Sequence, residues 1–276
     1  MIHPRKNWIP ASVSTLFLYM FKWILICGLI GVLVGSASAF FLWGLDWATN
    51  WRESHVWIIA LLPLGGLIIG LTYHYWGETV VKGNNQLLEE FHSPKKVIPL
   101  RMAPLVLFGT IATHLFGGSA GREGTAVQMG GAIADQFTKI FRLRPRDRKV
   151  LLSAGVSAGF ASVFGTPLAG AIFALEVFVV GKVRYEGLLP VFLAAFVADW
   201  MCHAWGIPHT VYAIPFVPAL TPLNLLMAIG VGILFGFTAR SFSFLARYWT
   251  AIFKRLAAWP PLRPVIGGAS LPWLSG

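Results

Sequence analysis

The sequence has few charged residues and almost no cysteine. Charged residues make up 12% of its 276 positions, whereas hydrophobic residues make up 56%. Soluble domains average about 25% charged and about 45–50% apolar residues, so an ordinary soluble domain is excluded. The two cysteines, Cys27 and Cys202, both fall within apolar runs. They are better explained as small apolar filler than as a disulfide, and no redox chemistry follows.

The sequence also gives little support to a metal site or an enzyme. The seven histidines show no HxxxH or HExxH spacing, so no metal and no other cofactor is expected. Ser153 and Ser157 lie one helical turn apart but have no histidine or aspartate near them in sequence. An intramembrane enzyme would need partners distant in sequence and is the weaker alternative. We therefore expect a protein that is not an enzyme.

Long apolar runs are abundant. A helix that crosses the hydrocarbon core needs about 20 apolar residues, which predicts a polytopic all-α membrane protein. A GxxxG step at Gly31 and Gly35 predicts close helix packing in the first run. Four runs are candidate spans, namely 16–45, 56–76, 188–205 (which is short) and 222–249. Three other apolar pieces are too short or interrupted, namely 98–116, 124–137 and 151–180, the last broken at Gly165-Thr166-Pro167.

The basic residues are grouped between the apolar runs. The net charge of +11 would suggest nucleic acid in a soluble protein, but here no aromatic and basic residues alternate on a water-facing surface. By the positive-inside rule the basic groups are cytoplasmic. The Lys- and Arg-poor segments 46–55 and 206–221 then lie outside, and both termini are predicted to be cytoplasmic.

The interrupted helices predict an anion site. Irregular backbone is tolerated at membrane depth only where it is buried in protein or lines a polar cavity. The first N–H groups of a helix lack partners, and the helix dipole places about half a positive charge there. Two such helix starts are predicted, in 82–90 and in 121–125. Together they supply the candidate anion-binding residues Gly83, Asn84, Asn85, Gly121, Arg122, Gly124 and Thr125.

Glu123 is the candidate gate of this site. Its carboxylate is an anion on the protein that is able to take the place of a permeant anion beside the free N–H groups, and protonation would release it. The alternative is that Glu123 only complements the helix dipole, which is worth about 0.3–1 kcal/mol. We favour the gate because carboxylates inside membranes are costly. For Arg122 we expect a buried or interfacial partner more than direct contact with the anion.

At these residues the sequence resembles the voltage-gated chloride channel superfamily of chloride channels and anion/proton antiporters. The family's GREGP motif is similar to Gly121-Arg122-Glu123-Gly124-Thr125, with Thr in place of Pro. The segment 165–176, GTPLAGAIFALE, resembles the family's NAPLAG…FxxE segment. The resemblance implies an inverted-repeat fold, a homodimer with one pore per subunit, and Glu123 as the gating glutamate.

Two departures from the family pattern bear on the ion. The family's GSGIP motif reads Gly83-Asn84-Asn85-Gln86-Leu87 here, which with GREGT is similar to the fluoride-exporting branch. A carboxamide offers two N–H donors where serine offers one hydroxyl, which suits a small, strongly hydrated anion, so fluoride is favoured over chloride. Val177 stands where chloride/proton exchangers carry an internal proton glutamate, so proton coupling would use another residue.

A third departure is length. The resemblance implies a second inverted half with a GxFxP helix start and, in many members, a tyrosine at the anion site, and neither is present in the 276 residues. We therefore expect residues 1–276 to be one incomplete transmembrane domain, the first half of the fold plus one or two further helices. Residues 1–15 would be the cytoplasmic N-terminus, 16–205 the first inverted repeat and 222–276 the start of the second.

These observations predict transport of fluoride or chloride, coupled to protons, by a multi-pass protein of a prokaryotic cell membrane. The expected partners are the anion, protons, the lipid bilayer and a second copy of the full-length chain, with no nucleic acid. The alternative for this polypeptide alone is a truncated fragment that does not transport, because half of the anion site would be missing.

Overall fold

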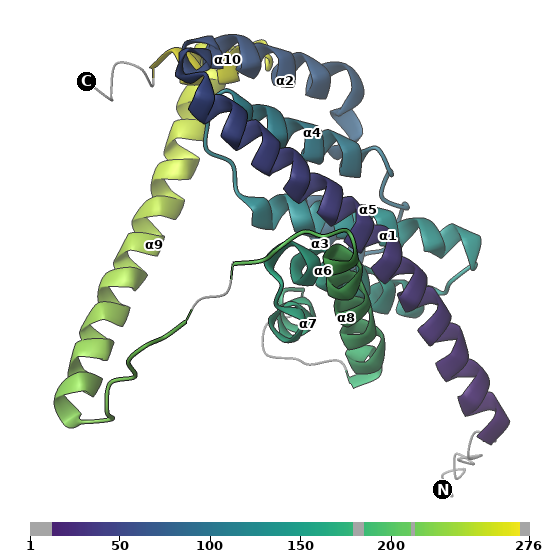
Figure 1. The fold of residues 1–276 in the computed structure, drawn as a ribbon. Coiled ribbons are helices and arrows are strands. Elements are labelled where there is room, and N and C mark those ends of the chain that lie inside the picture. The colour runs from purple at the N-terminus through teal and green to yellow at the C-terminus, as the bar shows by residue number, and fades with distance from the viewer. Residues whose placement is uncertain (1–12, 179–184, 211–212, 271–276) are drawn as a thin grey trace, which may run out of the picture.

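The structure is a computed structural model that describes residues 13–178, 185–210 and 213–270. Within those ranges it contains helices and no strand, which confirms the all-α prediction. The predictions for the extreme N-terminus and for residues 271–276 lie outside the described residues. Figure 1 shows α1 (Val13–Ser54) running diagonally across the other helices, with α9 (Pro222–Leu256) standing apart from them.

Among the described residues, three helices are long and apolar enough to cross a membrane. They cover Tyr19–Ser54, Val56–Trp76 and Pro222–Leu256, which confirms three of the predicted spans. The second consists of the 3-10 helix η1 (Val56–Leu61) followed by α2 (Leu62–Trp76). The first and third helices run past the predicted ends at residues 45 and 249, because a helix continues into its polar flanks beyond the apolar run. The short fourth run forms α8 (Leu188–Ala204).

The interrupted pieces form separate helices, and the break predicted at 165–167 is confirmed, although α5 and α6 are longer than predicted, with 19 and 20 residues. Pro145–Phe164 (α6) ends at Gly165, whose φ of +66° is the left-handed conformation of a helix C-terminus, and Pro167 opens α7 (Pro167–Glu176). The remaining elements are η2 (Glu78–Val80), α3 (Asn84–His92), α4 (Met102–Leu115), α5 (Arg122–Ile140), η3 (Tyr185–Gly187) and α10 (Leu262–Ser270).

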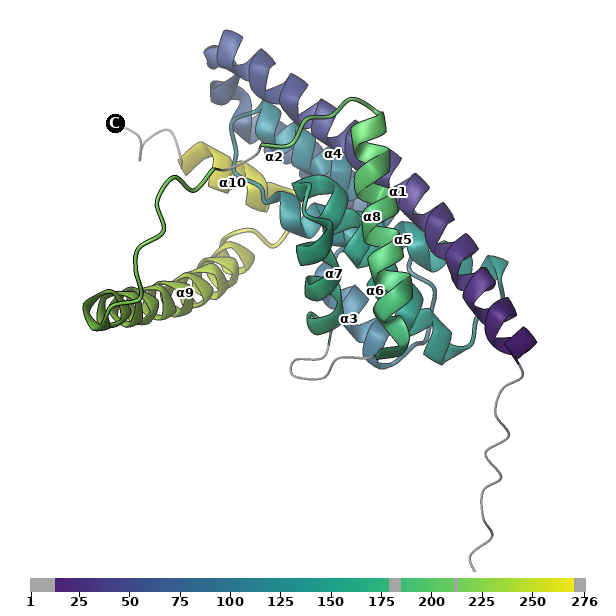
Figure 2. The same cartoon turned by 60° about the horizontal axis from the view of Figure 1, so that its bottom comes forward.

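The core lies around α6, which packs against α1, α5, α7 and α8 (Figure 2). Helices α5 and α6 approach so closely that a Cβ on Gly155 would lie 2.5 Å from the Gly130 carbonyl oxygen. The predicted GxxxG contact is confirmed between α1 and α8, because a Cβ on Gly31 would lie 2.7 Å from Val197 Cβ. Small residues thus bring four helices together.

A buried ionic network joins α3, α5 and α6. Arg148 donates to both carboxylate oxygens of Asp135 at 2.7 Å and to Glu90 at 3.0 Å. Asp135 also accepts the amide of Ile98 at 2.8 Å, and Glu90 accepts the amide of Lys95 at 2.8 Å. Asp135 is fully buried, so this network fixes the loop before α4 to the helices that carry the predicted anion site.

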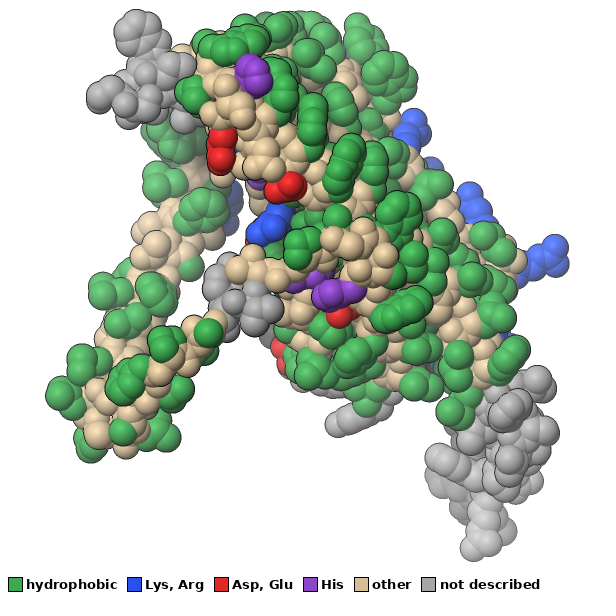
Figure 3. Space-filling view, in the orientation of Figure 1, with side chains coloured by type: hydrophobic (Ala, Val, Ile, Leu, Met, Phe, Trp, Pro, Cys, Tyr) green, Lys and Arg blue, Asp and Glu red, His purple; other side chains and the backbone are tan. Residues whose placement is uncertain are grey.

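Helix α9 packs against almost nothing. None of its residues is buried in the described part of the chain, and hydrophobic side chains cover the surface it presents in Figure 3. At its far end the chain turns into α10, which packs against α2, where a Cβ on Gly66 would lie 2.9 Å from the Pro264 carbonyl oxygen.

Candidate anion site

Two helices begin beside one another without a side-chain cap. Helix α3 begins at Asn84 after Gly83, and α5 begins at Arg122 after Gly121. Neither glycine has a side chain to accept the first helical amides, and no capping bond is formed. At the α5 start the leading N–H groups are left for a ligand. At the α3 start the amides of Asn85 and Gln86 already donate to the Lys82 and Gly83 carbonyls at 3.1 and 3.0 Å, which leaves the Asn84 amide and the positive end of the helix dipole. Gly83 has a φ of +54°, which a residue with a side chain adopts only with strain.

The Asn84 carboxamide bridges the two helix starts. A Cβ built on Gly124 would lie 3.6 Å from Asn84 Nδ2, so the side chain of the α3 start rests against the α5 start. Gln128, one turn further along α5, reaches the same place. A Cβ on Gly83 would lie 3.2 Å from Gln128 Nε2. Sequence reasoning missed Gln128, although its position four residues after Gly124 puts it on the same helix face.

Glu123 lies in the first turn of α5. Its Oε2 is 2.7 Å from the place of a Cβ on Gly121, so the carboxylate folds back over the glycine that precedes α5. The side chain is exposed, and among the described residues it accepts no hydrogen bond. Asn85 is also exposed and has no side-chain hydrogen bond in the same ranges. The gating and anion-binding roles of these residues stay predictions.

The Thr125 hydroxyl is engaged inside the protein. It is buried, lies 2.6 Å from the hydroxyl of Thr110 on α4 and lies 3.5 Å from the Gly121 carbonyl. The role of Thr125 in an anion site stays a prediction. The Thr that replaces the family's Pro thus joins α5 to α4 through a buried hydroxyl pair.

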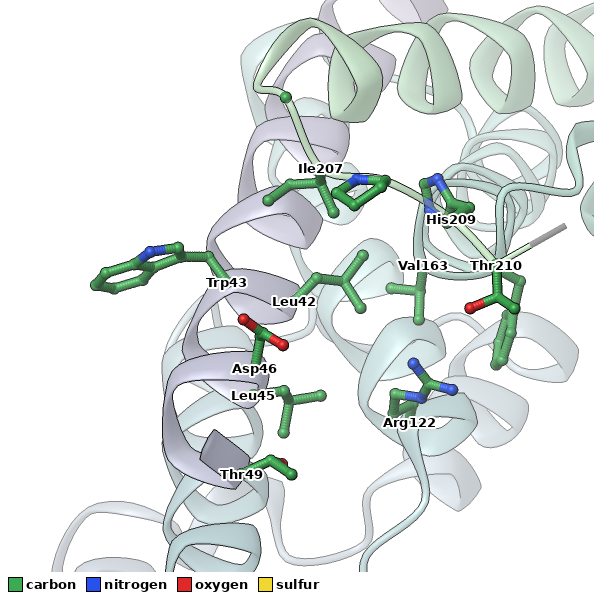
Figure 4. Close-up of a pocket in the computed structure, with 13 residues that line it drawn as sticks. Leu42, Trp43, Leu45, Asp46, Thr49, Arg122, Val163, Ile207, His209 and Thr210 are labelled. Carbon is green, nitrogen blue, oxygen red and sulfur yellow. The ribbon is translucent and has the colours of Figure 1, made fainter. Parts of the chain in front are cut away.

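Arg122 points into a cavity of about 570 Å³. Its guanidinium carbon lies 5.9 Å from the centre of the Phe164 ring, and among the described residues no carboxylate lies within 4.0 Å of it. The expected partner is thus an aromatic ring. Figure 4 shows the guanidinium extending toward the side of the cavity where His209 and Thr210 lie, with Asp46 on α1 opposite.

Ser157 is not placed as a hydrolase nucleophile would be. The spacing Gly-x-Ser-x-Gly occurs at 117–121 and at 155–159. The second lies inside α6, where Ser157 is buried and donates to the Val191 carbonyl at 3.1 Å. A nucleophile elbow needs a strand-to-helix turn, which a helix interior does not provide.

The fold and these helix starts define a class of protein, an α-helical membrane protein whose broken helices point their N-termini at one place. The family model described as "Voltage gated chloride channel" matches residues 65–275. This chain belongs to the voltage-gated chloride channel family, and the family resemblance noted from its motifs is confirmed.

Proteins similar to this chain have names that indicate different activities. The chain is 54% identical over 250 residues to a "Chloride/fluoride channel protein" of Pseudomonas syringae pv. tomato, covering 91% of this chain and 55% of that protein. It is 30% identical over 167 residues to the "H(+)/Cl(-) exchange transporter ClcA" of Vibrio vulnificus, covering 55% of this chain and 36% of that protein.

Among solved structures, a "CLC-type fluoride/proton antiporter" superposes with a TM-score of 0.88 at 36% identity, over 95% of this chain and 66% of that chain. A slow cyanobacterial Cl-/H+ antiporter gives a TM-score of 0.76 at 20% identity, covering 90% of this chain and 62% of that chain, which shows the shared fold. The chain therefore spans between about a third and two thirds of the length of these matches.

Proposed function

We propose that the protein containing this chain moves fluoride across a membrane in exchange for protons, with Glu123 as the gate. The observation that carries the proposal is the Asn84 carboxamide resting against Gly124, where two uncapped helix starts meet. Backbone and carboxamide N–H groups at positive helix ends attract an anion without a formal cation. Transporters use broken helices in this way at the bilayer midplane.

Two observations favour fluoride over chloride. The 54% identical relative is named a chloride/fluoride channel, and a 36% identical structure is titled a fluoride/proton antiporter. The donors near Gly124 are carboxamide N–H groups of Asn84 and Gln128, and N–H donors suit a small anion with concentrated charge. Proton exchange is supported by the similarity to the fluoride/proton antiporter and by a carboxylate at the helix start.

The test is anion flux from liposomes that contain the purified chain. We expect fluoride efflux, followed with a fluoride-selective electrode, to depend on pH in the native protein. In Glu123→Ala this pH dependence should disappear, because no carboxylate competes with the anion or carries a proton. The matched control is Asp147→Asn, which removes a carboxylate from the first turn of α6 and leaves the α5 start intact.

The control separates the two interpretations of Glu123. If Glu123 only complemented the helix dipole, both variants would lose a little stability and neither would alter flux. Efflux that keeps its full pH dependence in Glu123→Ala contradicts the gate. Efflux at the rate of empty liposomes from every variant would support the alternative that this polypeptide does not transport on its own.

The choice of ion has a separate test. In Asn84→Ser one hydroxyl replaces a carboxamide at the α3 start, so the ratio of fluoride to chloride efflux should fall. An unchanged ratio would contradict the role of Asn84 in ion selection. The control is Asn50→Ser, because Asn50 bonds Asp46 at 3.1 Å on an exposed face of α1.

The assembly and the orientation belong to the same proposal. A homodimer with one pore per subunit is expected to elute at twice the chain mass after correction for detergent. Cytoplasmic termini predict that a cysteine in place of Lys254 reacts with an impermeant maleimide only from the cytoplasmic side of the cell membrane. Reaction from the outer side would reverse the topology.

A further inference from the structure

Three potential metal ligands meet where α8 ends. Asp199 and His203 lie one turn apart on α8, and His209 follows in the loop after it. The ligand atoms of the three side chains all lie within 4.8 Å of one another, and the two imidazole rings are 5.0 Å apart. No motif spacing marks this group, because its third member approaches only through the fold.

Two atoms of the group are buried and have no hydrogen-bond partner in the described residues, although one of them, Asp199 Oδ1, lies 3.7 Å from His203 Nδ1. These are Asp199 Oδ1 and His209 Nδ1. Buried polar atoms are nearly always hydrogen bonded in folded proteins, so each orphan needs an explanation such as an ion or a water. Two orphans from different parts of the chain that face the same place are explained together by one ligand that accepts electron pairs from both.

The hydrogen bonds of both histidines set their tautomers. His209 donates from Nε2 to the Ser162 carbonyl at 2.9 Å, which leaves the lone pair of its Nδ1 free. His203 donates from Nδ1 to the Asp199 carbonyl at 2.9 Å, which leaves the lone pair of its Nε2 free. A histidine that binds a metal characteristically donates its other N–H to a carbonyl or carboxylate in this way.

The loop histidine is held in place by the end of α6. A Cβ on Gly165 would lie 2.6 Å from His209 Cγ, so the imidazole packs directly on the glycine backbone. Gly165 has a φ of +66°, which glycine adopts without strain. The ring is therefore positioned by two contacts with the end of α6 and does not depend on the metal for its place.

We propose that Asp199, His203 and His209 bind one divalent transition metal ion of the zinc class. Imidazole nitrogen favours zinc, copper, nickel or iron over magnesium and calcium, which prefer oxygen ligands. Two histidines and one carboxylate leave a fourth position for water. Because His209 also lines the cavity that contains Arg122, the ion would lie at the wall of that cavity (Figure 4).

The test is a titration of the full chain, purified without a histidine tag and treated with chelator. Zn²⁺ binding is followed by calorimetry, and Co²⁺ binding by the visible absorption that nitrogen and oxygen ligands produce. We expect one ion per chain. His209→Ala and His203→Ala should each weaken binding by more than about 100-fold. That figure is the upper end of the loss in metal affinity when a residue that only supports a ligand is mutated, and the loss of a ligand itself should be larger.

His203 is exposed, so His203→Ala leaves the packing intact and remains informative even if a variant at the more buried Asp199 fails to fold. The matched control is His92→Ala. His92 makes the same hydrogen bond to the carbonyl four residues earlier, at 2.9 Å, and belongs to no such group of three among the described residues. The proposed site is overturned if the native chain binds no ion, or if His209→Ala, His203→Ala and His92→Ala bind it with equal affinity.

Discussion

The more apolar of the helices α6 and α9 is the less buried one. Helix α9 is 35 residues long, apolar enough to span a membrane, and has no buried residue in the described structure. Helix α6 has 20 residues, carries charges in its first turn, and is buried along most of its length. Lipid tails are as apolar as large apolar side chains, so such side chains gain nothing when they move from lipid into the protein. Small residues are therefore the ones that become buried between helices.

The interface of α5 and α6 shows the physical cause. Gly130 and Gly155 let the two backbones touch, and Gly159 and Ala126 repeat the contact one turn away. Close backbone approach increases van der Waals contact, which drives helix association where the hydrophobic effect is absent. On α9 a Cβ added to Gly230, Gly232 or Gly236 would meet nothing within 4 Å. Glycine on its own therefore does not mark an interface.

The largest expected effect is in the buried ion network. Arg148→Met should lower the free energy of unfolding by about 3–5 kcal/mol, because Asp135 would be left buried without its partner. Chemical denaturation in detergent, followed by circular dichroism, measures this loss. Arg146→Met is the control, because its ion pair with Glu186 is exposed and should contribute at most about 1 kcal/mol. Equal losses would contradict the distinction.

The next effect tests the glycine contact itself. Gly155→Val should cost about 1–3 kcal/mol or more, because its Cβ would lie 2.5 Å from the Gly130 carbonyl oxygen. Gly232→Val on α9 makes the same chemical change with open space around it. The difference between their midpoints of thermal unfolding isolates packing from helix propensity. A Gly232→Val protein as unstable as Gly155→Val would show that α9 is also tightly packed.

A smaller effect is expected at the hydroxyl pair of α4 and α5. Thr125→Val should cost about 0.5–1.5 kcal/mol, the net contribution of one hydrogen bond. The Thr110 hydroxyl keeps its bond to the Val106 carbonyl at 2.8 Å, so no unsatisfied donor remains. A double-mutant cycle with Thr110→Val measures the coupling. A coupling energy of zero would mean that the 2.6 Å contact adds nothing to stability.

The smallest effect is expected on α9. Phe237→Ala should change the free energy of unfolding by less than about 0.5 kcal/mol, because the ring is 66% exposed. The measurement is the same denaturation in detergent. A loss of several kcal/mol, typical of a buried phenylalanine, would show that another surface covers this face of α9.

The helix ends and starts at glycine and proline are predictable from sequence because their causes are local. Gly165 ends α6 and Pro167 opens α7 for reasons contained in those residues, namely a left-handed φ and a fixed φ without an N–H. The α3 start after Gly83 has the same local cause, because Gly83 has a φ of +54°. The GREGT and GTPLAG segments indicate the voltage-gated chloride channel family, and the family model confirms it.

The partners of polar side chains were not predicted. Arg148, one of the basic residues between the apolar runs, is buried with Asp135 and Glu90, which are 13 and 58 positions away. His209 reaches Asp199 across the end of α8. No sequence period links such residues, so a metal site was not expected.

The sequence by itself determined that this chain enters a membrane as helices, where those helices break, and to which family it belongs. These properties depend on apolar length, on backbone conformations allowed to glycine and proline, and on short motifs. Only the tertiary structure decided which helices are buried and which side chains meet, as Gln128 does with Gly83. Those outcomes depend on how closely backbones from distant parts of the chain approach one another, and no local property of a residue encodes that distance.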